Sequence, residues 1–568
     1  MTCKEKILSE EYGEIIVDFT NPFTTEEENE QYCFTRINSR FGIAYLLQSA
    51  LQDMMGNLYV YHTLPKVFGL MAEDFDPISL INSGVLQTQR PPLSLTGRGV
   101  VVAFIDTGIR YAQEEFLNEA GNSRITAIWD QTIQTGAPPE GYAYGTLFTR
   151  EDLNEALRAE NPYDVVPSYD ENGHGTAMAS VAAGSVLDGG RSFRGAAPEA
   201  DIVVVKLRQA KKNLKDYYLI AEDAIAFAET DIMLGVKFAE SFASTFRRPV
   251  VICIGIGTNS GNHTIGSSLA RYLNELSEIR NRGIVICAGN EGNAGHHFSA
   301  PVPHGRFEEG DAYVDVELRV GEGERGFLLE TWGCVPDVLY ASVRTPGGEM
   351  IPRFRLGMGQ SLTYSFVYER TKITIDSVLV EPSSGNELIV FRFAEPTAGV
   401  LTIRIFAAQD GGSGEFHMWL PITEFLSSQT YFLKPDPYVT ITDPGIADRP
   451  ITVSTYDDLN NSFYVNSGRG YLRNGLVKPD LAAPGVNVST SLGKRTGSSI
   501  AAAMTAGGVA QFFQWAVIQQ NNPLVESNEI KTYFIRGASR DSDLVYPNRE
   551  WGYGRLNVAG TFEALAGV

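Results

Sequence analysis

The chain has 568 residues, of which 43% are apolar and 11% aromatic. A chain of this length and apolar content can build a large core, so we expect two or three folded domains and exclude extended disorder. Lys and Arg number 46 against 68 Asp and Glu, which gives a formal charge of −22. So acidic a surface repels phosphate backbones and anionic lipid, and we therefore expect neither a nucleic-acid partner nor a membrane partner.

The N-terminal residues lack the apolar core and small-residue cleavage site of a secretory signal, and the sequence holds no apolar run long enough to span a bilayer. We therefore expect synthesis in the cytoplasm. The five cysteines are odd in number and widely scattered, and no pair has the spacing of a zinc or redox motif. This usage favours a reducing compartment, and no ligand pattern predicts a metal or a cofactor.

The first 72 residues predict a small α/β unit. An apolar strand is expected over residues 15–19, a helix over 40–55 and a second strand over 58–62.

From residue 100 onward, continuous apolar runs alternate with helical stretches. Runs of this kind are typical of strands that are buried on both faces of a parallel sheet. The strands are expected over 100–105, 202–206, 250–256 and 283–288, and the helices over 217–243 and 267–281. The alternation predicts an α/β domain with a doubly wound parallel sheet.

Residues 305–430 break this rhythm. Residues 312–320 alternate strictly between apolar and polar side chains, and 388–393 and 401–405 repeat that period of two. The pattern predicts an all-β sandwich inserted into the α/β domain, which then consists of residues 73–304 and 431–568. The α/β pattern resumes over 450–456 and ends in a long apolar helix expected over 501–519.

Four motifs place reactive side chains at strand ends or helix starts. Asp106 ends the first buried strand, His174 opens a helix of small residues, Asn290 follows the strand at 283–288, and Ser499 lies in the first turn of the last long helix. The carboxyl ends of parallel strands meet in one crevice, and a helix N-terminus favours developing negative charge.

Each residue alone also has an ordinary structural explanation. Asp106 could cap a turn, His174 could be a hydrogen-bonded core residue, and Asn290 could belong to a Gly-rich turn. Ser498 and Ser499 would serve equally well as a helix N-cap. The four in combination are much harder to explain this way.

The order Asp, His, Asn, Ser resembles the subtilisin-like serine proteases, or subtilases. The resemblance rests on the DTG of Asp106–Gly108, the HGT of His174–Thr176, AGNEG at 288–292, KPDLAAPG at 478–485 and GSSIAAAMTAG at 497–507. Ala503 and Met504 depart from the family, which normally has Pro and often has His there; both lie past the reacting serine.

The resemblance implies the roles of these residues. His174 would take the proton of Ser499 while the hydroxyl attacks a peptide carbonyl, and Asp106 would hold the imidazole. The Ser499 backbone N–H and the Asn290 amide would stabilise the resulting oxyanion.

By alignment with the family, the segment that contains Gly255 and Gly257 would pair with the substrate backbone, because glycines permit close approach. The position of Asp106 also implies a maturation site near residues 69–74. Residues 1–72 then resemble the family's α/β propeptide, a folding aid and inhibitor that is removed by self-cleavage; the alternative is an unrelated N-terminal domain.

A propeptide, the lack of an export signal and a single β insert narrow the resemblance to the Csp proteases of clostridial spores, which carry a jellyroll insert and act in germination. In that subfamily the cleaved propeptide stays bound, and the active member converts the zymogen of a spore-cortex hydrolase. The resemblance thus implies a protein substrate, the chain's own propeptide as a partner, and incorporation into the spore. Two alternatives remain: a pseudoprotease that acts as a germination sensor or scaffold, and a general intracellular subtilase. The first would be expected to show a substituted triad, and this sequence shows none.

Overall fold

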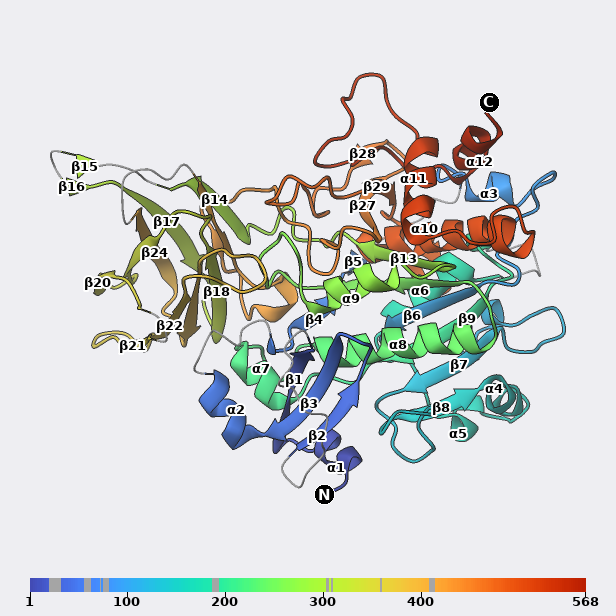
Figure 1. Ribbon diagram of the computed structural model, residues 1–568, viewed down its shortest axis with the longest axis horizontal. Coiled ribbons are helices and arrows are strands. Elements are labelled where there is room, and N and C mark those ends of the chain that lie inside the picture. The colour runs from blue at the N-terminus through green and yellow to red at the C-terminus, as the bar shows by residue number, and fades with distance from the viewer. Residues whose placement is uncertain are drawn as a thin grey trace.

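A nine-stranded, mostly parallel sheet forms the centre of the protein (Figure 1). The computed structural model describes residues 1–19, 32–55, 63–71, 73–74, 81–185, 194–302, 306–307, 310–357, 360–407 and 414–567. The strand order is β28-β27-β13-β11-β6-β9-β7-β8, with β29 also paired to β27. The strands are β6 (Val101–Asp106), β7 (Ile125–Asp130), β8 (Thr146–Thr149), β9 (Asp201–Lys206), β11 (Val250–Ile254), β13 (Arg282–Cys287), β27 (Ile451–Asp457), β28 (Ser462–Phe463) and β29 (Leu481–Pro484).

Helices cover both faces of this sheet, as a doubly wound fold requires. Helices α6 (His174–Ala183) and α10 (Ser498–Phe513) pack on one face, and α8 (Glu229–Thr245) and α9 (Ser268–Leu276) on the other. Alternate residues of β6 divide accordingly: Val102 and Phe104 belong to the first core, and Val101, Ala103 and Ile105 to the second. The other α-helices described in this domain are α3 (Val85–Thr88), α4 (Arg150–Ala156), α5 (Pro162–Val165), α7 (Lys212–Tyr217), α11 (Ser527–Gly537) and α12 (Val558–Ala566), with a 3-10 helix at Glu114–Phe116 and a π-helix at Gln514–Ile518.

The four buried strands match their expected positions to within two residues, but the helices differ more. The helix expected over 217–243 begins only at Glu229, because α7 ends at Tyr217 and residues 218–228, which end in the short strand β10 (Phe227–Ala228), separate the two. The helix expected over 501–519 begins at Ser498. By length and composition, Ser498–Ile518 is the one helix of the described residues that could cross a membrane, and 89% of its most apolar window is buried inside the protein. Its apolar character is therefore that of a core helix.

The N-terminal unit is a three-stranded antiparallel sheet in the order β1-β3-β2, flanked by two helices. Its elements are α1 (Cys3–Leu8), β1 (Tyr12–Asp18), β2 (Tyr32–Arg36), β3 (Phe41–Leu47) and α2 (Gln48–Met55). The expectation of a helix over 40–55 is wrong in its first half. Phe41, Ile43 and Tyr45 are fully buried at a period of two, which is the period of a strand. The strand expected over 58–62 lies outside the described residues.

A disulfide joins Cys3 of α1 to Cys33 of β2, so the N-terminal unit is cross-linked. The expectation drawn from cysteine spacing missed this pair, because partners 30 residues apart carry no motif. Cys253 and Cys287 are free thiols buried in β11 and β13 of the central sheet.

The insert is a sandwich of a six-stranded and a five-stranded sheet, and it lies beside the α/β domain, at the left of Figure 1. The orders are β14-β25-β18-β23-β22-β21 and β20-β19-β24-β17-β26. Strands β14 (His297–Pro301) and β26 (Tyr431–Phe432) belong to it, so it extends beyond the expected bounds of 305 and 430. The other strands are β17 (Tyr313–Val320), β18 (Gly326–Trp332), β19 (Leu339–Arg344), β20 (Met350–Phe354), β21 (Ser361–Ser365), β22 (Lys372–Val378), β23 (Leu388–Ala394), β24 (Gly399–Ala407) and β25 (Glu415–Trp419); the short β15 (Arg306–Phe307) and β16 (Gly310–Asp311) pair with each other.

Candidate active site

The structure brings Asp106, His174 and Ser499 together in one buried hydrogen-bonded row. Asp106 Oδ1 lies 2.7 Å from His174 Nδ1, and His174 Nε2 lies 3.0 Å from Ser499 Oγ. The three side chains come from the end of β6, the first residue of α6 and the first turn of α10. This geometry allows a proton to pass from the hydroxyl to the imidazole while the carboxylate holds the ring.

Local sequence fixes the start of α6 beside Asp106. The Asp170 carboxylate accepts hydrogen bonds from the backbone N–H groups of Gly173 and Thr176 and from the Thr176 hydroxyl, which caps the helix. Gly175 allows the close approach, since a Cβ there would lie 2.4 Å from the Gly108 carbonyl oxygen.

Two opposing effects set the pKa of His174. Burial disfavours the imidazolium and lowers this pKa, but the charge of Asp106, its hydrogen bond and the charge of Asp170 outweigh burial. The pKa of His174 therefore lies above its ordinary value of 6.5.

The cleft is occupied by the chain itself. Strand β4 (Val67–Leu70) lies between β10 (Phe227–Ala228) and β12 (Ile256–Gly257), and it is antiparallel to both. Directly after β4, the carbonyl oxygen of Met71 lies 2.9 Å from Ser499 Oγ and 3.4 Å from Ser499 N. The Met71 carbonyl thus meets the nucleophile as a substrate carbonyl would.

The chain stays in the cleft beyond this point. Strand β5 (Glu73–Asp74) pairs with β31 (Gly493–Thr496), which leads directly into α10 and pairs on its other side with β30 (Val488–Thr490). Backbone pairing therefore holds the chain at 67–70 and again at 73–74, and both stretches reach into the region 69–74 where the sequence predicts a maturation site.

Asn290 lies beside the N-terminus of α10. Its Oδ1 accepts the Ser498 backbone N–H at 3.0 Å, and the Gly289 N–H donates to Ser498 Oγ at 3.1 Å. These two hydrogen bonds clip the loop after β13 to the helix that carries Ser499, and they orient the Asn290 amide through its oxygen.

The two predicted substrate-binding glycines have different positions. Gly257 lies in β12 opposite Gly69 of β4. Gly255 lies outside that ladder and next to the nucleophile: a Cβ there would come within 2.9 Å of Ser499 Cβ and 2.4 Å of Met178 Sδ. The absence of a side chain at Gly255 thus makes room for Ser499.

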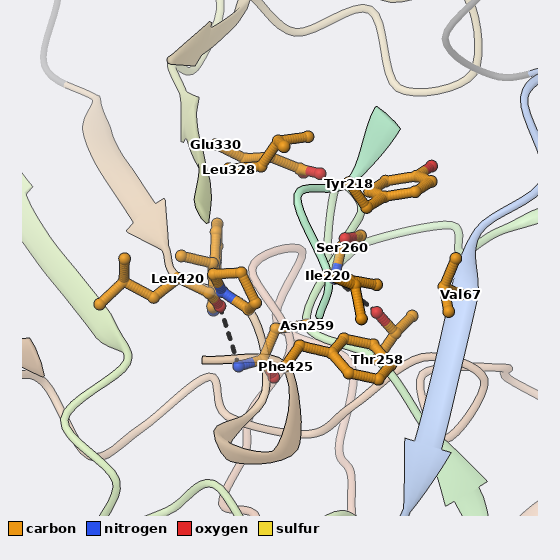
Figure 2. Close-up of a pocket in the computed structure, with 12 residues that line it drawn as sticks. Val67, Tyr218, Ile220, Thr258, Asn259, Ser260, Leu328, Glu330, Leu420 and Phe425 are labelled. Carbon is orange, nitrogen blue, oxygen red and sulfur yellow. Dashed lines mark hydrogen bonds between the residues drawn. The ribbon is translucent and has the colours of Figure 1, made fainter. Parts of the chain in front are cut away.

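The insert reaches the cleft through a segment that sequence reasoning missed. Residues 420–426, here called the return segment, lead back from β25 and contain a short 3-10 helix, Thr423–Phe425. Phe425 and Leu420 line a small pocket together with Val67 of β4 (Figure 2). Leu328 and Trp419 of the insert and Tyr218 and Thr258 of the α/β domain line other parts of it. No sequence motif marks this contact, because it joins segments far apart in the chain.

Within the part of the chain that the structure describes, no group of three or more His, Cys, Asp or Glu residues could hold a metal ion.

Comparisons with known proteins agree with this geometry. A model of the subtilase family matches residues 97–305 and 423–554. The solved structure of the Clostridium perfringens CspB protease superposes with a TM-score of 0.75 at 30% identity, covering 86% of this chain and 99% of that one.

Two plant proteins are more distant relatives. Subtilisin-like protease SBT5.5 of Arabidopsis thaliana is 24% identical over 434 residues, which are 69% of this chain and 50% of the plant protein. Subtilisin-like protease SBT3.6 of the same plant is 23% identical over 228 residues, 37% of this chain and 28% of the relative. The chain thus spans about half the length of the first plant relative. The family match covers both halves of the α/β domain: Asp106 and His174 lie in the first matched range and Ser499 in the second. The chain therefore belongs to the subtilase family of serine peptidases.

Proposed function

We propose that this chain is a serine endopeptidase whose first substrate is its own Met71–Ala72 bond. The observation that carries the proposal is the 2.9 Å contact between the Met71 carbonyl oxygen and Ser499 Oγ, in a segment paired like a bound peptide. The side chain of Met71 is 1% exposed, so the residue before the cleaved bond is enclosed by the enzyme.

The reaction follows from the positions of the groups. Ser499 Oγ attacks the Met71 carbonyl carbon as His174 Nε2 takes its proton, and the carbon becomes tetrahedral. The Ser499 N–H and the Asn290 side-chain NH₂ group donate to the developing oxyanion. His174 then gives the proton to the Ala72 amine, which leaves, and water releases Met71 from the acyl-enzyme by the same steps.

The test is the Ser499→Ala variant of the full chain. We expect the wild-type protein to be recovered as two fragments whose new ends are Met71 and Ala72, as read by mass spectrometry. The variant should remain one chain. Equal cleavage of the two proteins would reject the role of Ser499.

We further propose that the cut N-terminal unit stays bound. Lys211 Nζ donates to the carbonyl oxygens of Ser9 and Tyr12, at 3.2 and 2.8 Å, and Arg208 Nη1 donates to that of Ile7 at 3.0 Å. Cutting the bond after Met71 breaks none of these contacts.

For the physiological substrate we propose the zymogen of a spore-cortex hydrolase, with the protein made in the cytoplasm and incorporated into the spore. The proposal is supported by the likeness to the CspB protease over 99% of that chain and by the resemblance to spore proteases in the sequence. Incubating the purified protein with such a zymogen from the same organism tests it. We expect a single cut that the Ser499→Ala protein does not make, and an intact zymogen after incubation with self-processed enzyme would refute the assignment.

A further inference from the structure

The return segment of the insert closes the cleft over Gly69, the third residue before the proposed cut. A Cβ added to Gly69 would lie 2.5 Å from Ile422 Cδ1 and 3.4 Å from Phe425 Cε1. Real Cβ atoms essentially never approach a carbon as closely as 2.5 Å.

Backbone conformation does not explain a glycine here. Gly69 lies in a regular antiparallel pair with Gly257, and its φ lies outside the positive region that disfavours side chains. The restriction therefore comes from the space left by Ile422 and Phe425.

These two side chains have little freedom to move away. Ile422 is fully buried and Phe425 is 5% exposed, and both belong to the core cluster that includes Val67, Leu328 and Trp419. Figure 2 shows Phe425 and Val67 among the residues that line the pocket next to this contact. Val67 and Gly69 lie on the same face of β4, because they are two residues apart in a strand. The insert therefore lies against this face of β4 at both positions.

The return segment is also hydrogen-bonded to the loop that carries Asn290. Glu291 Oε1 accepts hydrogen bonds from Thr423 N at 3.2 Å and Thr423 Oγ1 at 3.1 Å, and its Oε2 lies 2.6 Å from His296 Nδ1. Glu291 and His296 are 3% and 6% exposed. The Leu420 N–H donates to the His296 carbonyl oxygen at 2.9 Å. The return segment, which covers Gly69, is therefore fixed to the loop that carries Asn290.

We propose that Ile422 and Phe425 make this enzyme selective for glycine at the third residue before the cut, so that its substrates carry Gly-X-Y ahead of the cleaved bond. The inference rests on the proposed function and deepens it: the insert is a specificity element of the peptidase. Alanine at that position requires the Ile422 methyl group to shift, and valine requires the return segment to move.

The experiment measures the rate of self-cleavage of the full chain after refolding, for wild type, Gly69→Ala and Gly69→Val. Overpacking costs about 1–3 kcal/mol, and the same cost in the transition state slows cleavage about 5-fold to 150-fold; we expect alanine near the lower end and valine near the upper. Each variant is then combined with Ile422→Ala, which removes the clashing methyl group and should restore cleavage. Ile403→Ala is the matched control, because it truncates an equally buried isoleucine in the sandwich core, away from the cleft.

Rescue by Ile422→Ala but not by Ile403→Ala supports the inference. Cleavage of Gly69→Val at the wild-type rate overturns it, and so does a failure of Ile422→Ala to restore cleavage to either Gly69 variant. A wild-type chain that stays uncut refutes instead the proposed self-cleavage, so the two failures are distinguishable.

Discussion

The imidazole of His174 lies between a carboxylate oxygen of Asp106, which accepts a hydrogen bond, and the hydroxyl oxygen of Ser499, which gives up a proton. The Asp106 carboxylate on one side raises the pKa of the imidazole, and the Ser499 hydroxyl on the other needs the imidazole to be neutral, since only the neutral ring accepts a proton. The residue is thus held nearer to its protonated form than an ordinary histidine, which sets a lower pH limit on catalysis.

The first prediction is a pH profile. Below the raised pKa the imidazole is protonated and inactive, so the self-cleavage rate should increase with pH through a midpoint above 6.5. Single-turnover conversion of the refolded chain at a series of pH values measures this midpoint. Asp106→Asn removes the charge that raises the pKa, so the midpoint should move down while the rate drops by about 10⁴-fold, as in another serine protease. An unchanged midpoint in that variant would contradict the assigned cause.

The second prediction concerns Gly175, where α6 meets the turn after Asp106. A methyl group there would lie 2.4 Å from the Gly108 carbonyl oxygen, a backbone atom that cannot rotate away. Gly175→Ala should therefore lower the free energy of unfolding by about 1–3 kcal/mol and abolish labelling of Ser499 by a fluorophosphonate.

The control for this variant is Gly235→Ala in α8. The atoms nearest to its Cβ would be side-chain carbons of Ile105 and Val205, the closest at 3.1 Å, rather than backbone atoms, and alanine favours a helix. Thermal denaturation and labelling should both stay close to wild type. Equal damage from the two substitutions would show that the contact with Gly108 has no special importance.

At the scale of elements, the return segment and the residue after it are bound to different parts of the protein. Thr423 is bound to Glu291 of the loop that carries Asn290, whereas the N–H of Ser427, directly after the segment, donates to Glu324 of the insert at 3.3 Å. The segment therefore connects the sandwich to the loop that carries Asn290.

The third prediction follows from this connection. Glu291→Ala leaves the buried donors of Thr423 without their acceptor, which should cost about 1–3 kcal/mol of stability. It should also weaken the selection against alanine at position 69, because the return segment is no longer held in place over that residue. Glu291→Gln keeps an acceptor oxygen and should lie between. Calorimetry and the self-cleavage rate of Gly69→Ala in each background measure both effects, and a fully stable Glu291→Ala protein would rule out this anchoring role.

Much of the α/β domain and the row Asp106, His174, Ser499 could be predicted, because the strands are continuous apolar runs and each reactive residue lies at a motif. Strand β3 could not, since its apolar residues fit a helical period as well as a strand period until Phe41, Ile43 and Tyr45 are all seen to be buried, at a spacing of two residues. The contact of Ile422 with Gly69 has no local signature either. It exists only because the insert returns over the cleft, which is a property of the tertiary fold.

At the scale of the whole molecule, the N-terminal unit is held by buried charge as well as by backbone pairing. Glu14 of β1 is buried near Asp231 and Arg208 of the α/β domain, with Lys211 on the same side and the Tyr45 ring close by. Burial and the charge of Asp231 raise the pKa of Glu14, and the two cations offset this only in part.

The fourth prediction is that this unit is retained more tightly at lower pH. A raised pKa in the complex means that the contribution of Glu14 is complete below its ordinary value of 4.5 and is lost as the pH rises through the raised pKa. Each unit of the shift changes the dissociation constant about tenfold. Glu14→Gln should remove this dependence and tighten retention at neutral pH, whereas Glu11→Gln, at an exposed position, should change neither. Gel filtration of the processed protein at several pH values tells them apart.

Strand β4 is hydrogen-bonded along both of its edges, to β10 and to β12. The proposed cut at its end would create a new carboxyl terminus but free neither edge, so each molecule would stay blocked until this strand leaves the sheet. The delay before such an enzyme can act on anything else is then set by how fast one short strand peels out of a sheet. Release of the strand is a unimolecular step, so the delay would begin with the first cut and would not depend on the concentration of the protein.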